Sequence, residues 1–171
     1  MQRQPTLLSS CASAATAAEA RFRIDFPEPA ARESRVIALD ERAAAVVGRL
    51  AGASWRGGRF LVFEDVLAAS GSDVDDADAT LRAVDGAETL LSMELAGADV
   101  AVVIATVEVR PEAAAVLGDA CAARMIMSAG LILAESEPPE EAVSALRPNA
   151  MVLAILKDEK DIPPILTALR V

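Results

Sequence analysis

Short apolar runs alternate with segments of helical periodicity along most of this chain. The apolar runs predict strands at 35–39, 59–63, 99–106, 125–134 and 149–156, with a weaker one at 79–84. The intervening segments predict helices at 41–50, 65–69, 86–95, 111–124, 138–146 and 161–169. Such alternation is typical of a mostly parallel sheet with helices on both faces. We therefore expect a three-layer, doubly wound, Rossmann-like α/β fold.

Several helix boundaries carry local signals. Asp40 precedes the predicted helix 41–50 and is placed to cap it, while Gly52 follows its end. Pro111 stands at the start of another predicted helix, where the missing N–H of proline costs no hydrogen bond. These signals agree with the hydrophobic period and strengthen the α/β assignment.

The first 33 residues differ from the rest. Residues 1–20 are rich in alanine, serine and threonine without a clear period, which predicts a flexible tail. Residues 21–26 alternate apolar and polar side chains, which predicts an added edge strand or an arm on another subunit. We therefore divide the chain into a tail and arm at 1–33 and a single α/β domain at 34–171.

Composition excludes several classes of function. The formal net charge of −10 argues against a nucleic-acid partner and against an anionic membrane surface, because both attract lysine and arginine. The sequence contains no histidine, which removes Ser-His-Asp and Cys-His catalysis and histidine-ligated zinc. Cys11 and Cys121 are too far apart in sequence for a metal-binding motif. We expect an acidic, soluble, cytoplasmic protein.

One region resembles the nucleotide-binding domain of the tubulin/FtsZ family. Gly97, Ala98 and Asp99 open an apolar strand, and a turn, a helix and a second strand at 126–132 follow. The resemblance implies a nucleotide-binding fold. However, the segment 106–112, which stands where that family has its phosphate loop, contains no glycine. This argues against a bound dinucleotide or GTP, so we carry over the fold alone and no functional residue.

Polar residues follow several predicted strands where the chain leaves the sheet. In doubly wound proteins, ligands bind outside these carboxyl ends. The candidate crevice residues are Asp40, Glu64, Thr106, Glu108, Arg110 and Glu135. Such a crevice, lined mainly by carboxylates, suits Mg²⁺, a cationic small molecule or a basic peptide. The alternative is that the acidic residues cap helices and interact with their dipoles.

Two functions remain open. The missing phosphate loops and histidines favour a non-catalytic scaffold that self-associates or binds a partner, and we expect a homo-oligomer. The arm at 21–26 offers one way for subunits to exchange a strand. The alternative is a small-molecule enzyme that works through carboxylates in the strand-end crevice, with Mg²⁺ as a possible cofactor.

Overall fold

The structure is a computed structural model that describes residues 30–67, 78–136 and 140–171. The predicted arm at 21–26, and nearly all of the tail, lie outside these residues. The strands are β1 (Ser34–Ala38), β2 (Gly58–Leu67), β3 (Asp78–Ala83), β4 (Glu88–Leu90), β5 (Val100–Thr106), β6 (Met127–Leu133) and β7 (Val152–Leu156). The helices are α3 (Glu41–Leu50), α4 (Leu91–Leu95), α5 (Pro111–Ala123), α6 (Glu140–Leu146) and α7 (Ile162–Ala168), with a 3₁₀ turn, η3 (Glu159–Asp161).

All seven strands form one sheet in the order β4-β3-β2-β1-β5-β6-β7. The five strands from β2 to β7 in this order are parallel, whereas β3 and β4 extend the β2 edge as antiparallel strands. The prediction of an α/β fold with a mostly parallel sheet is therefore confirmed. Because β1 pairs in parallel with both β2 and β5, the carboxyl ends of these three strands point to the same end of the sheet.

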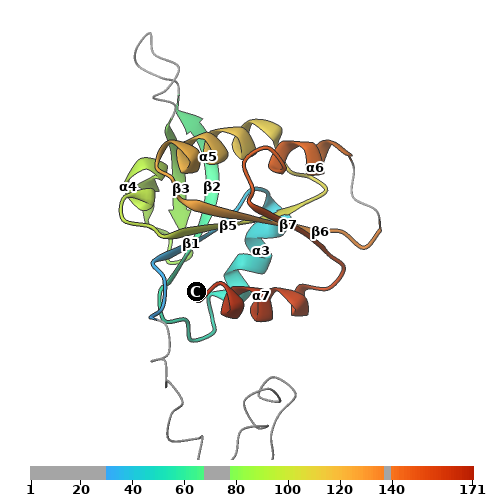
Figure 1. The fold of residues 1–171 in the computed structure, drawn as a ribbon, viewed down its shortest axis with the longest axis horizontal. Coiled ribbons are helices and arrows are strands. Elements are labelled where there is room, and N and C mark those ends of the chain that lie inside the picture. Colours follow the sequence, from blue (N-terminus) through green and yellow to red (C-terminus); the bar gives the residue numbers. More distant parts are fainter. Residues whose placement is uncertain (1–29, 68–77, 137–139) are drawn as a thin grey trace, which may run out of the picture.

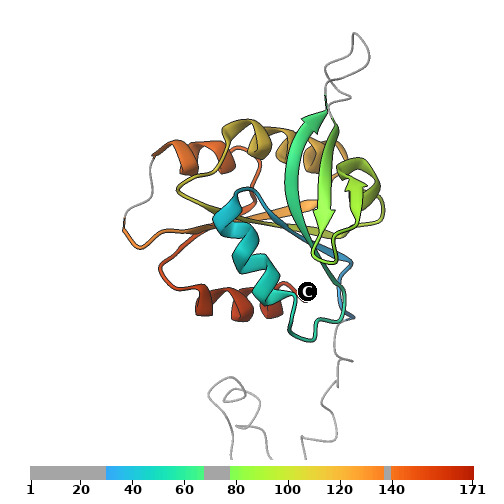
Figure 2. The ribbon, with the colours of Figure 1, turned by 180° about the vertical axis from the view of Figure 1, so that it is seen from behind.

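Two clusters of buried side chains hold the helices against the sheet. Val36 and Ala38 of β1 pack with α3 and α7, whereas Ile37 and Leu39 pack with α4, α5 and α6. This alternation follows the two-residue repeat of a strand, which sends successive side chains to opposite faces. Figures 1 and 2 show α5 and α6 on one side of the sheet, with α3 and α7 on the other.

One predicted helix is wrong, and a second is correct only over its last five residues. The helix predicted at 65–69 falls where β2 continues to Leu67, because β3 pairs with β2 beyond an irregularity between Phe63 and Asp65. The helix predicted at 86–95 is a short strand, β4, followed by the five-residue α4. Gly86 has a positive φ of 91° and forms the turn that folds β4 back on β3. Local periodicity does not reveal this hairpin.

Other boundaries agree closely with the predictions. The predicted helix 41–50 coincides with α3, and the prediction 111–124 differs from α5 by one residue. Asp40 caps α3 as expected, and Pro111 stands in the first turn of α5. Among the helices of the described segments, none is long and apolar enough to cross a membrane.

Candidate functional site

Asp40 and Thr106 meet where β1 and β5 end side by side. The Asp40 carboxylate accepts the Ala43 N–H at 2.8 Å, which caps α3. It also accepts the Thr106 N–H at 2.7 Å and the Thr106 hydroxyl at 3.0 Å. Thr106 Oγ1 in turn accepts the Glu108 N–H at 3.2 Å. The strand-end prediction thus brings Asp40 and Thr106 together, with the Asp40 carboxylate holding a helix and a strand end in place.

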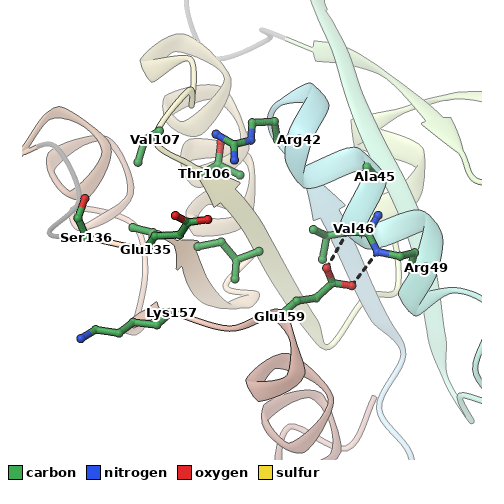
Figure 3. Close-up of a pocket in the computed structure, with 12 residues that line it drawn as sticks. Arg42, Ala45, Val46, Arg49, Thr106, Val107, Glu135, Ser136, Lys157 and Glu159 are labelled. Carbon is green, nitrogen blue, oxygen red and sulfur yellow. Dashed lines mark hydrogen bonds and ion pairs between the residues drawn. The ribbon is translucent and has the colours of Figure 1, made fainter.

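A cavity of about 530 Å³ opens beside this pair, between α3 and the carboxyl ends of β5, β6 and β7 (Figure 3). We call it the strand-end cavity. Its apolar lining consists of Ala45, Val46, Val107, Leu133 and Ala134. Its polar lining consists of Arg42, Arg49, Thr106, Glu135, Ser136, Lys157 and Glu159. The volume lies in the usual range for a small-molecule site, whereas polar and charged side chains make up more of the lining than in most such sites.

Two arginines of α3 contribute ion pairs at this cavity. Arg49 donates two hydrogen bonds to the Glu159 carboxylate, at 2.9 and 2.6 Å. These hydrogen bonds hold the pKa of Glu159 below its usual value. Arg42 lies 3.7 Å from the Glu108 carboxylate, and both side chains are more than half exposed. Such an exposed pair contributes little stability and leaves the arginine available to a ligand.

Glu135 and Lys157 carry the remaining charges of the cavity. Leu133 and Leu156, the last residues of β6 and β7, are paired, so these two charged residues leave adjacent strand ends. Both are exposed, and neither forms a hydrogen bond or ion pair with another described residue. Figure 3 shows the Lys157 side chain extending away from the Arg49–Glu159 pair. Within the part of the chain that the structure describes, the rim therefore offers one carboxylate and one ammonium without a partner.

Neither Glu64 nor Arg110 lines the strand-end cavity. Glu64 pairs with Arg82 at 2.6 Å, and Arg110 donates to the Glu64 carbonyl at 2.8 Å. The Arg110 guanidinium also lies 5.7 Å from the centroid of the Phe63 ring. A second cavity of about 370 Å³ has Arg110 and Phe63 in its lining.

The six candidate residues therefore do not share one crevice. Thr106 and Glu135 line the strand-end cavity, Asp40 supports it through Thr106, and Glu108 contacts it through Arg42. Within 30–67, 78–136 and 140–171, no cluster of three or more acidic or cysteine residues is arranged to hold a metal ion.

Four charged residues of the cavity were not among the sequence candidates. Arg42 and Arg49 lie on a helix seven residues apart, a spacing that places them on one face. Lys157 and Glu159 follow the last strand, as the strand-end pattern requires. Helical spacing combined with strand-end position was therefore the signal that could have identified them.

Comparison with known proteins found no matching family model, no matching curated protein and no matching solved structure. The resemblance to the tubulin/FtsZ family therefore stays a prediction.

Proposed function

We propose that this protein is a non-catalytic binding scaffold whose strand-end cavity takes a small zwitterionic molecule. The observation that carries the proposal is that Glu135 and Lys157, on the rim of a cavity of about 530 Å³, have no charged or hydrogen-bonded partner among the residues that the structure describes. A ligand with one ammonium and one carboxylate satisfies both charges at once. A ligand of single charge leaves one of them without a partner.

We also propose that the fold is doubly wound, with three layers. The parallel strands follow the order β2-β1-β5-β6-β7, which corresponds to the flavodoxin-like order of doubly wound proteins. In that arrangement, ligands bind outside the carboxyl ends near the point where strand order reverses, here between β1 and β5. Thr106 at the end of β5 lines the strand-end cavity, so its position supports a ligand site on grounds independent of charge.

The environment of the carboxylates favours binding over catalysis. A general acid or base needs a carboxyl group that reaches the reacting atoms. Asp40 instead accepts three hydrogen bonds from the chain itself, and Glu108 and Glu64 each lie against an arginine. Among the acidic residues lining the cavity, Glu159 is bound to Arg49, which leaves Glu135 for the ligand.

A thermal-shift series tests this proposal. Glycine, β-alanine and γ-aminobutyrate vary the distance between the two charges, while succinate, putrescine and magnesium chloride supply the other charge patterns. At about 100 times its dissociation constant, a ligand adds about 2.7 kcal/mol to the free energy of unfolding. For a chain of this length, that raises the melting temperature by about 5–10 °C. We expect a shift of this kind with at least one zwitterion.

Variants locate the binding. Glu135→Gln and Lys157→Gln should each abolish the shift, whereas Lys160→Gln, a matched change at a nearby exposed lysine, should retain it. Zwitterions without effect, or a shift that survives both rim substitutions, would overturn the proposal. A shift with magnesium chloride that disappears in Glu135→Gln would instead support the carboxylate-based alternative.

A further inference from the structure

The two edges of the sheet differ in a way that points to a partner. At one edge, β4 has only three residues and begins with Glu88, features that discourage pairing with another strand. At the other edge, β7 has five residues, and none from Asn149 to Leu156 is charged. Strand β7 pairs with β6 on one side and with no described strand on the other. An open, uncharged edge is a template for strand addition.

Side chains along this edge are unusually exposed for their type. Val152 and Ile155 are 51% and 50% exposed, and Met151, just before the strand, is 74% exposed. Leu153 packs toward α6 in one core cluster, while Ala154 and Leu156 pack toward α7 in the other. The edge therefore presents apolar side chains on both sides of an open backbone.

Backbone direction shows which groups are open. The Leu156 carbonyl accepts the Ala134 N–H at 2.9 Å, so the backbone N–H and carbonyl of Leu156 point toward β6. Alternate residues of a strand direct their backbone groups to the same side. Leu153 and Ile155 therefore direct their N–H and carbonyl groups outward, away from β6.

We propose that two copies of this chain pair antiparallel through β7, making one sheet continuous across a two-fold axis. Leu153 of each copy then lies opposite Ile155 of the other, and these residues exchange their open backbone hydrogen bonds. Ala154 lies at the axis. The two-fold makes the interface self-complementary, as a closed dimer requires. This inference is independent of the strand-end cavity and its ligand.

Charge on α6 supports a second copy over an unrelated strand. Glu140 and Glu141 begin α6 and Arg147 follows its end, and none of the three forms an ion pair with another described residue. α6 connects β6 to β7 and lies above them in Figure 1. Antiparallel β7 strands bring two α6 helices past each other in opposite directions, so acidic ends face the arginine of the other copy. Each α6 helix thus supplies both the acidic and the basic side chains that meet across the proposed interface.

Light scattering after size-exclusion chromatography tests the dimer in the full chain. At about 100 µM, we expect twice the 17.8 kDa of one chain. Ile155→Lys places a charge on the exposed edge and should give monomer with an unchanged circular dichroism spectrum. Met93→Lys, the same change at a residue 67% exposed on α4, should remain dimeric.

Amide hydrogen exchange tests whether β7 itself forms the interface. In the dimer, the amide hydrogens of Leu153 and Ile155 should exchange with solvent at least tenfold more slowly than in wild-type protein diluted until it is monomeric. The Leu153 amide should also exchange at least tenfold more slowly in the dimer than in the monomeric Ile155→Lys variant. A wild-type monomer at about 100 µM, a dimer that survives Ile155→Lys, or unprotected amides in a dimer would each overturn the proposal.

Discussion

Replacing Asp40 by alanine tests the junction between β1, α3 and β5. The substitution removes the cap of α3, which costs about 0.5–2 kcal/mol. It also leaves the N–H of Thr106, a residue only 6% exposed, without its acceptor, which costs about 1–3 kcal/mol. Together we expect the free energy of unfolding to fall by about 2–4 kcal/mol.

Urea denaturation followed by circular dichroism measures this loss. The expected change lowers the midpoint by about 1–2 M urea. Asp119→Ala is the matched control, because it removes the same charge from an exposed position on α5. We expect that control to stay within about 0.5 kcal/mol of wild type.

A double-mutant cycle with Thr106→Val separates the strand contact from the helix cap. Because the Thr106 hydroxyl donates to Asp40, the two substitutions should couple by about 0.5–2 kcal/mol. Additive losses, or a loss below about 0.5 kcal/mol for Asp40→Ala alone, would refute the role assigned to this carboxylate.

Three further predictions follow from the packing and the charges. Gly48→Ala should raise the free energy of unfolding by about 0.5–1 kcal/mol, because a Cβ at this position meets open space. Gly118→Ala should lower it by about 1–3 kcal/mol, because its Cβ collides with the Asn149 side chain. Urea denaturation curves in which both substitutions change the free energy of unfolding in the same direction would contradict this. Burial raises the pKa of Cys121 to about 11, so in a Cys11→Ser variant the thiol should resist Ellman's reagent at pH 8 until urea is added, and rapid native labelling would count against its burial. Arg49 and Glu159 should show a small favourable coupling at pH 7 in a double-mutant cycle, as expected for a largely exposed ion pair. Because the hydrogen bonds from Arg49 lower the pKa of Glu159, the coupling should persist above the ordinary glutamate pKa and disappear as the pH falls through the lowered value.

The sequence by itself determined the βα alternation and most of its boundaries. Continuous apolar runs such as that of β5 identify buried strands without reference to the rest of the chain. Asp40 and Pro111 mark helix starts through contacts or constraints within a few residues, so local chemistry is sufficient to find them. For the same reason, the sequence could predict that Asp40 caps α3.

Only the tertiary structure decided how these elements meet. β3 pairs antiparallel with β2 and β4 pairs antiparallel with β3, and the local helical propensity of residues 86–90 does not compete with these pairings. Glu64 and Glu135 both follow predicted strands, yet they lie in different surroundings, because strand order and side-chain direction decide which ends share a cavity. Residues distant in sequence also decide which partners the charges of α3 contact and that β7 lies at an edge of the sheet. Strand ends can be read from local pattern, whereas a cavity or an interface is a relation between elements and requires the fold.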